Sequence, residues 1–521
     1  MRRLLVLVVF TTLLLGSCAT PPAAAGPDHL VRILTGSPST LDPAVQSDAG
    51  SAAITAQMFE SLTAFDADLH VRPALAESWQ FADGGQRVTF HLRPNLSFSD
   101  GSPLRPSDVV RSWMRIIDPA HPSPLASLIL DVAGADAFLR GQSTDPGTVG
   151  LHADDGAGDL VVDLARPATD FVNIVAGPTF SVVPPAIGTD PAVLAPGAGF
   201  VGSGGYTVTG KTATTLQLTA NPHYWAGPPA ISRIDLVTDL GGREPVDAFA
   251  SGDLDYTPVS SIDATWIGYD QQLGPQLRLV ASLSVQYYGF DTSRPPFNDA
   301  RVRRAFGEAI DWRRMAALSG SDGTSQVATS MVPPGIPGRS DTDFVPKYDP
   351  ADARTLLADA GFPGGAGFPA TTLMTGGSGF DPAIVAEVKR ELGITLQAES
   401  MGDGYFDRLA SDPPAMWGLG WVADYPGRND FLGVLLGTGQ SNNYGRWSSA
   451  TFDAAIADAV SAADPTAASA AYDRAETVVR DEVPVVPVVY GPGWALSRQG
   501  LLGAGQNGLG IVRMAGLAWA P

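Results

Sequence analysis

The chain has 521 residues, 44% hydrophobic and 17% charged, and its 54 acidic and 33 basic residues give a formal net charge of −21. This composition is typical of a globular protein with a hydrophobic core, and the length favours two or more lobes. The acidic excess excludes nucleic acid as a partner, because phosphates need basic patches, and it fits a soluble monomer.

The amino terminus has the pattern of a secretory signal peptide. Arg2 and Arg3 precede an apolar run at 4–15, which is too short for a membrane span of about 20 residues. The sequence LGSC at 15–18 resembles the lipobox of bacterial lipoproteins, and Cys18 is the only cysteine. We therefore expect a signal peptide at 1–18, lipidation of Cys18, a Pro/Ala-rich tether at 19–27 and no disulfides.

Strands and helices alternate through the rest of the chain. Residues 87–92 alternate apolar and polar side chains, which predicts a half-buried strand. Asp299 can cap a helix with an apolar stripe, and Asp349 can cap another that begins at Pro350. The β-branched run at 483–490 contains two prolines, which predicts a crossing segment or an edge strand. The fold class is therefore α/β or mixed α+β.

Motifs of enzymes are missing. The sequence contains neither a G-x-S-x-G nor an H-E-x-x-H motif, and its six histidines are scattered singly. Two G-x-G-x-x-G matches, at 197–202 and 503–508, lack the helix that a dinucleotide fold requires. We expect no catalytic activity, no cofactor and no metal.

Five separated segments are distinctive. They are PALAESW (73–79) with VTFHLRP (88–94) and FSDGSPL (98–104); GGY (204–206) with NPHYWAGP (221–228); GFD (289–291) with PPFND (295–299); YDP (348–350) with AGF (360–362); and GWVADYP (420–426). In this order they resemble the extracytoplasmic solute-binding proteins of ABC importers, in the oligopeptide/dipeptide/nickel-binding family, family 5.

The resemblance implies a two-lobed clamshell of the periplasmic-binding-protein type, the larger kind with an additional domain. Its expected parts are lobe I at 28–50, 178–272 and 489–521, an additional domain at 51–177 packed on lobe I, and lobe II at 273–488. Two segments near 270–285 and 484–492 would cross between the lobes, and the solute would bind between them.

The resemblance also implies site residues. In peptide-binding members the aspartate of a Trp-x-x-Asp segment pairs with the ligand's α-amino group, and Asp424 stands at this position after Trp421. The expected ligand-binding residues are Asp424, Trp421, Tyr425, Asn443, Tyr444, Arg446, Ser37 and Tyr287.

Several alternatives stay open at these positions. Asp424 could be a solvated loop residue, or Arg428 could neutralise it. Arg446 would hold a ligand carboxylate if it is not simply a surface arginine. Only one of Tyr287 and Tyr288 can face the cleft, because neighbouring strand residues point to opposite faces.

The leading hypothesis is a lipid-anchored binding subunit on the outer face of the cell membrane. It would capture short peptides and deliver them to the permease and ATPase subunits of an ABC importer. Alternatives with the same fold are binding of a metal chelate, haem or a sugar, or a role as a sensor lipoprotein. An exported hydrolase is the alternative that the sequence favours least.

Overall fold

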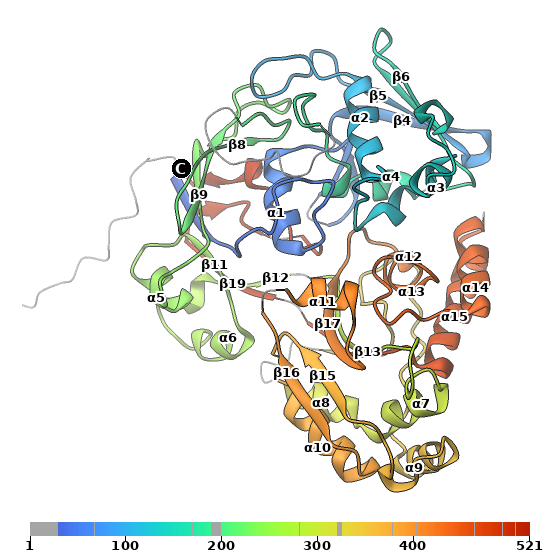
Figure 1. Cartoon of the computed structure of the whole chain (residues 1–521). Coiled ribbons are helices and arrows are strands. Elements are labelled where there is room, and N and C mark those ends of the chain that lie inside the picture. Colours follow the sequence, from blue (N-terminus) through green and yellow to red (C-terminus); the bar gives the residue numbers. More distant parts are fainter. Residues whose placement is uncertain are drawn as a thin grey trace, which may run out of the picture.

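The computed structural model describes residues 30–521 except 67, 169, 189–199, 281, 320–325, 378, 403, 463, 492 and 506. The expected signal peptide, Cys18 and the tether lie outside the described residues. The described chain forms two lobes, and a further domain packs on the first of them (Figure 1).

Lobe I is built on a seven-stranded mixed sheet. Its order is β12 (Leu277–Val280), β19 (Gly493–Ser497), β11 (Tyr256–Val259), β1 (Leu30–Leu34), β10 (Arg233–Val237), β9 (Thr215–Ala220) and β8 (Tyr206–Lys211). Strand β1 is parallel to β10 and β11, and the other pairings are antiparallel. The helices of this lobe include α1 (Ala49–Met58), α5 (Pro245–Ala250) and α6 (Ser261–Ile267).

The additional domain contains a four-stranded antiparallel sheet in the order β4 (Ala76–Ala82), β5 (Arg87–Leu92), β7 (Asp159–Asp163) and β6 (Leu151–Asp154). Helix α2 (Pro106–Ile116) buries Trp113, whose indole donates to the Phe180 carbonyl oxygen at 2.9 Å. Arg115 of the same helix forms a buried ion pair with Asp42 of lobe I at 2.5 Å. These contacts fix the domain to lobe I.

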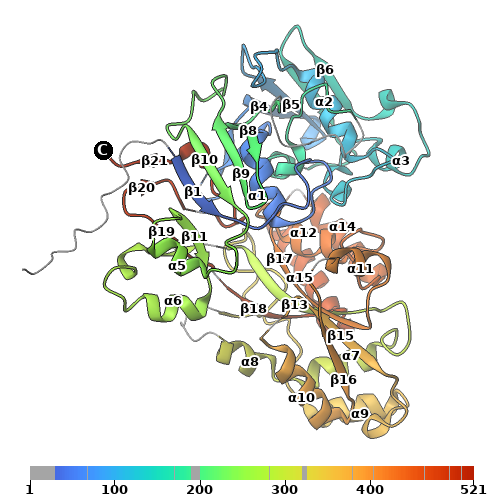
Figure 2. The ribbon, with the colours of Figure 1, turned by 60° about the vertical axis from the view of Figure 1, so that its left-hand side comes forward.

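Lobe II is built on a six-stranded sheet. Its order is β14 (Gln326–Val327), β18 (Val485–Tyr490), β13 (Ser284–Phe290), β17 (Met416–Val422), β15 (Thr371–Thr375) and β16 (Leu396–Ser400). Its helices include α7 (Ala300–Ala309), α8 (Trp312–Ser319), α9 (Pro350–Asp359), α10 (Asp381–Leu392), α11 (Tyr405–Ser411), α12 (Arg428–Phe431), α13 (Gly433–Leu436), α14 (Ala450–Ser461) and α15 (Pro465–Glu482). Figure 2 shows this lobe below lobe I and the additional domain.

The two-lobed α/β fold with an additional domain is confirmed, and so are three local predictions, the strand at 87–92 and the two helix caps. The strand at 87–92 is β5. Asp299 caps α7 by accepting from the Arg301 N–H, and Asp349 caps α9, which begins at Pro350. Each cap satisfies an N–H group that lacks a partner within its helix.

The prediction of an edge strand at 483–490 is wrong, and the predicted crossing between the lobes comes only after this strand, between Tyr490 and Gly493. Strand β18 is a fully buried inner strand, with β13 on one side and the short β14 on the other. Pro487 fits there because the β13–β18 register shifts beside it, where Gln286 pairs with Val489 and Tyr287 with Pro487. A proline can lie inside a sheet where such an irregularity removes the need for its N–H.

Two of the expected lobe boundaries differ from those that the strands of the two large sheets indicate. Strand β12 belongs to the sheet of lobe I, so that lobe extends to Val280 rather than 272. Strand β18 belongs to the sheet of lobe II as far as Tyr490, which pairs with Gln326 of β14, beyond the expected end at 488. The crossings therefore lie between Val280 and Ser284 and between Tyr490 and Gly493. The division of the chain into these three units stays a prediction.

Candidate functional site

A cavity of about 850 Å³ lies between the lobes. Lobe I contributes Val259, Ile262 and Trp494 from β11, α6 and β19. Lobe II contributes residues of β13, β17 and β18 and, after β15, Gly376, Gly377 and Gly379. The cavity lies at the carboxyl end of β15 and beside residues 418–420 of the parallel strand β17. Open α/β sheets commonly bind ligands at the carboxyl ends of their strands.

Strand β17 presents an unpaired edge beside this cavity. It pairs with β13 along its whole length, but with β15 only at Met416 and Trp417. From Gly418 on, no described strand pairs with β17 on that side, although the Gly418 carbonyl oxygen accepts the Tyr405 hydroxyl. Residues 418–420 also line the cavity. Such an edge can pair with the backbone of an extended peptide.

Position 418 in the cavity wall has no room for a side chain. A Cβ on Gly418 would lie 2.7 Å from the Tyr288 ring. Glycine therefore lets this ring lie across β17, and the Tyr288 hydroxyl donates to Asp381 at 3.0 Å.

Asp424 follows β17 by two residues and lies beside a second carboxylate. Its backbone N–H donates to Asp430 Oδ2 at 3.1 Å, and the Trp421 indole donates to the same oxygen at 3.0 Å. Asp424 Oδ2 and Asp430 Oδ1 are buried and have no hydrogen-bond partner among the described residues. Burial raises the pKa of Asp424 to about 7, and burial with the neighbouring Asp424 charge raises the pKa of Asp430 well above its usual value. No ion pair joins either carboxylate to a described lysine, arginine or histidine.

Arg428 does not supply a cation to this pair of carboxylates. Its guanidinium binds Asp473 at 2.7 Å and Glu476 at 2.5 Å, both on α15, and donates to the Gly338 carbonyl oxygen at 2.8 Å. The alternative in which Arg428 neutralises Asp424 therefore finds no support in the structure.

The other aromatic candidates lie in different places. Tyr287 and Tyr288 both line the interlobe cavity, so the expectation that only one of them faces the cleft is wrong. Their side chains still enter different hydrophobic clusters, because neighbouring strand residues point to opposite faces. Trp421 binds Asp430 and is not among the cavity-lining residues. Tyr425 is buried and lines a separate cavity of about 260 Å³, which it shares with Arg166 of the additional domain.

Four candidates are not brought to the cavity. The Asn443 amide donates to the Leu436, Gly437 and Trp447 carbonyl oxygens, so it organises its own loop. Tyr444 packs edge-on against Trp417. Arg446 is exposed and donates to the Ser411 carbonyl oxygen, and Ser37 is exposed after β1. Their positions do not support the expected ligand contacts.

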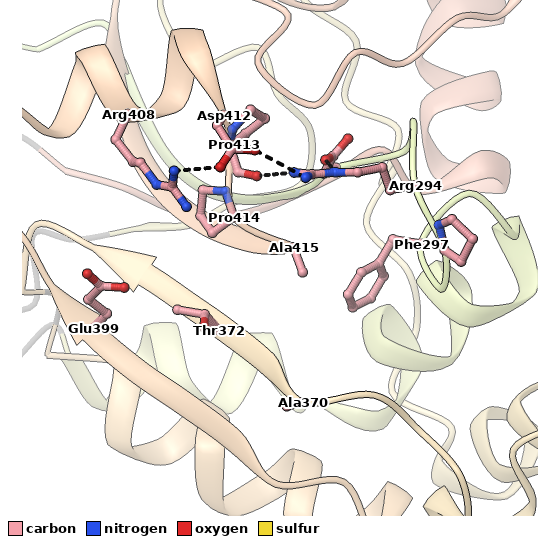
Figure 3. A pocket seen from close by; sticks show the side chains of 12 residues that line it. Arg294, Phe297, Ala370, Thr372, Glu399, Arg408, Asp412, Pro413, Pro414 and Ala415 are labelled. Atoms are coloured by element: carbon pink, nitrogen blue, oxygen red, sulfur yellow. Dashed lines mark hydrogen bonds and ion pairs between the residues drawn. The ribbon is translucent and has the colours of Figure 1, made fainter.

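A second cavity, of about 310 Å³, lies beside the amino ends of β15 and β17 (Figure 3). It is lined by Arg294, Arg408, Asp412 and Glu399, among others. Both arginines already bind Asp412, at 3.1 and 2.6 Å. Since no described arginine there lacks a carboxylate partner, the interlobe cavity is the better candidate site.

One group of described residues has metal-ligand spacing. Ligand atoms of Asp66, Asp68 and His70 lie within 4.8 Å of one another, on the exposed turn between β2 (Thr63–Phe65) and β3 (Val71–Pro73). Arg72 already binds Asp66 at 2.6 Å, and we assign no metal there.

Comparison with known proteins decides the family. A sequence model described as "Bacterial extracellular solute-binding proteins, family 5 Middle" matches residues 70–443. The chain belongs to this family. A family 5 relative, the "Probable deoxycholate-binding periplasmic protein YgiS" of Escherichia coli, is 29% identical and covers 87% of this chain and 86% of its own. The "Periplasmic oligopeptide-binding protein OppA" of Salmonella typhimurium is 28% identical and covers 94% of this chain and 93% of its own.

Solved family 5 structures share the fold. The murein tripeptide binding protein MppA of Escherichia coli superposes with a TM-score of 0.86, at 25% identity, over 94% of this chain and 98% of its own. Haemophilus influenzae OppA in complex with RPPGFSPFR superposes with a TM-score of 0.85, at 21% identity, over 95% of this chain and 99% of its own. The unliganded open form of MppA superposes with a TM-score of only 0.66, at 24% identity, over 95% of this chain and 98% of its own. The lobes described here are thus arranged more like the first two structures than like the open form.

Sequence reasoning missed most of the cavity wall. The three glycines at 376, 377 and 379 were not candidates, and neither were Met315, Phe380 and Trp494. A glycine-rich turn directly after a buried strand was a usable signal for the first of these. No described helix is long and apolar enough to cross a bilayer.

Proposed function

We propose that this protein captures short peptides between its lobes as the binding subunit of an ABC importer. The observation that carries the proposal is the unpaired edge of β17, which runs from the cavity wall at 418–420 towards Asp424. An extended peptide can add its backbone to this edge, with its amino terminus towards Asp424. Relatives named as oligopeptide-binding and murein peptide-binding proteins support this reading.

The chemistry of the Asp424–Asp430 pair fits an ammonium group. Two buried carboxylates with unsatisfied oxygens and no cation repel each other, and a ligand ammonium would relieve that repulsion. The ammonium would make these contacts only when the lobes enclose it, so binding would stabilise the closed arrangement.

The test is calorimetry of Asp424→Asn with a short free-amine peptide. We expect affinity to fall by about 1–3 kcal/mol, because a charge-assisted bond becomes a neutral one. Asp341→Asn, at a fully exposed site, is the matched control and should bind like the parent. Acetylating the peptide amine should weaken binding to the parent and leave little further effect in Asp424→Asn. Equal affinity of the parent and Asp424→Asn would remove Asp424 from the site.

We further propose that Cys18 is lipidated, so that the protein is anchored on the outer face of the membrane near its permease. The LGSC sequence at 15–18 supports this. Cell fractionation tests it: the parent should sediment with membranes, and Cys18→Ser should appear in the soluble exported fraction. Uptake of labelled peptide that needs both this protein and a permease would separate import from sensing.

A non-peptide solute is the second candidate, because one relative is named as probably deoxycholate-binding and the cavity is largely apolar. Native mass spectrometry of the purified protein separates the two. Co-purified peptides would support the leading proposal, and a bound steroid or haem would overturn it.

A further inference from the structure

The wall of the interlobe cavity carries no formal charge. Among the described residues that line its 850 Å³, none is Asp, Glu, Lys, Arg or His. The wall consists of aromatic and aliphatic side chains, a large share of glycine backbone, and the polar side chains of Ser284, Gln286 and Thr375. The cavity wall is thus uncharged although the chain as a whole carries a net charge of −21.

The carboxylate behind this wall is already satisfied. Asp381 accepts hydrogen bonds from two cavity-lining hydroxyls, those of Tyr288 and Thr375. Both hydroxyl hydrogens are therefore directed to Asp381. What these residues offer to a ligand is mainly the Tyr288 ring and the Thr375 methyl group.

Charge is therefore concentrated at one end of β17. The strand passes from the uncharged wall at 418–420 to the uncompensated Asp424–Asp430 pair beyond Val422. A ligand charge held in the uncharged part would lose its hydration without gaining a partner, which is strongly unfavourable. A carboxylate there would also find no described cation.

From this division, and resting on the proposed function, we propose that the solute is a peptide whose amino-terminal end is cationic and whose following side chains are uncharged and mostly apolar. The cavity receives these apolar side chains. The terminal carboxylate needs no cation from the protein, so an amidated peptide binds as well as the free acid.

Calorimetry with one set of hexapeptides tests this. The peptides have a free amino terminus and alanine at every position except three to five, which are all Leu, all Gln, all Lys or all Glu. We expect the Leu peptide to bind tightest, the Gln peptide to be intermediate, and the Lys and Glu peptides to be at least tenfold weaker than the Leu peptide. The Leu acid and Leu amide should agree within threefold.

A cavity variant reverses the preference. Gln286→Glu places one anion on the wall, and it should weaken the Leu peptide and strengthen the Lys peptide, changing their affinity ratio at least tenfold. Gln80→Glu makes the same change on exposed β4 and should leave the ratio as in the parent. Both variants alter surface positions, so their thermal unfolding should match that of the parent.

The outcomes separate this inference from the proposed function. If Lys or Glu peptides bind as tightly as the Leu peptide, or if amidation costs tenfold, the inference is overturned while peptide capture stands. If no peptide binds but deoxycholate does, peptide capture is overturned, and the uncharged cavity is assigned to an apolar solute of another class.

Discussion

Asp424 and Asp430 form a carboxyl pair whose burial and mutual repulsion disfavour the ionised forms. Asp430 uses one oxygen to accept from Trp421 and from the Asp424 backbone, so the two carboxyl groups are held together. Each has a buried oxygen without a partner among the described residues. At least one of the two carboxyl groups is best kept protonated when no ligand is present. The site therefore stores unfavourable energy that a cation can release.

This pair makes stability depend on pH. The pKa of Asp424 is raised to about 7 by burial, against about 3.9 in an unfolded chain. Between these values the native state binds more protons than the unfolded state, so the free energy of unfolding falls as pH rises. We expect the ligand-free parent to lose about 1–3 kcal/mol from this site between pH 5 and 7.5, measured by urea unfolding.

Asp424→Asn isolates that contribution. The variant keeps a neutral side chain at every pH, so it should be more stable than the parent at pH 7.5 and similar to it at pH 5. Asp131, Asp170 and Glu476 also have raised pKa values, but they titrate in both proteins and cancel in the difference. A constant stability difference across this range would contradict the prediction.

For single residues, the family motif indicated which positions to consider, but it did not predict which of their side chains are available to a ligand. It indicated Asp424, and the structure leaves that carboxylate without a cation. It also indicated Asn443, whose amide is used up by the carbonyl oxygens of its own loop. Sequence order could not distinguish them, because a hydrogen bond depends on the path of the backbone and not on nearness in the chain.

Among the elements, α12 is fixed to α15 through one buried arginine. Arg428 and Glu476 are both almost fully buried and 2.5 Å apart, and the guanidinium also lies 5.1 Å from the centre of the Tyr472 ring. This contact holds the segment that follows Asp424 against the long helix of lobe II. The position of Asp424 and Asp430 thus depends on the ion pair between Arg428 and Glu476.

Removing this arginine should be costly. Arg428→Ala leaves Glu476 buried and uncompensated, so we expect a loss of about 3–5 kcal/mol in the free energy of unfolding. Arg474→Ala is the matched control, since Arg474 pairs with Asp458 on the exposed faces of α15 and α14 and should cost less than about 1 kcal/mol. Adding Glu476→Gln to Arg428→Ala should recover part of the loss. Equal effects of the two arginine variants would show that the buried pair has no special role.

Elements governed by local chemistry were predictable from sequence. Strand β5 and the caps of α7 and α9 follow from alternation and from side-chain acceptors within three residues. Strand β18 was not predictable in this way, because Pro487 inside it and Pro484 just before it suggest an exposed position. The register shift opposite Tyr287 that accommodates Pro487 depends on a partner strand some 200 residues away.

For the whole molecule, binding depends on how the lobes meet. The cavity wall joins Val259 of lobe I to Gly418 of lobe II, residues that only the tertiary fold brings together, and this explains why sequence reasoning missed most of it. Away from the cavity, two hydrogen bonds between described residues cross from lobe II to the additional domain. Arg166 donates to the Val460 carbonyl oxygen at 2.6 Å, near the carboxyl end of α14, and Ser441 donates to the Pro124 carbonyl oxygen at 2.5 Å. Both bonds would break when the lobes separate.

The Ser441 bond gives a test of closure that does not touch the ligand. Ser441→Ala removes a bond of the closed arrangement only, so we expect peptide affinity to fall by about 0.5–1.5 kcal/mol, mainly through faster dissociation, with unchanged unfolding of the ligand-free protein. Ser461→Ala is the control, because that hydroxyl donates to Ala457 within its own helix. Stopped-flow dissociation of a labelled peptide measures the effect. If Ser441→Ala releases the peptide at the rate of the parent, closure does not depend on this contact, and affinity is set within the cavity and at Asp424.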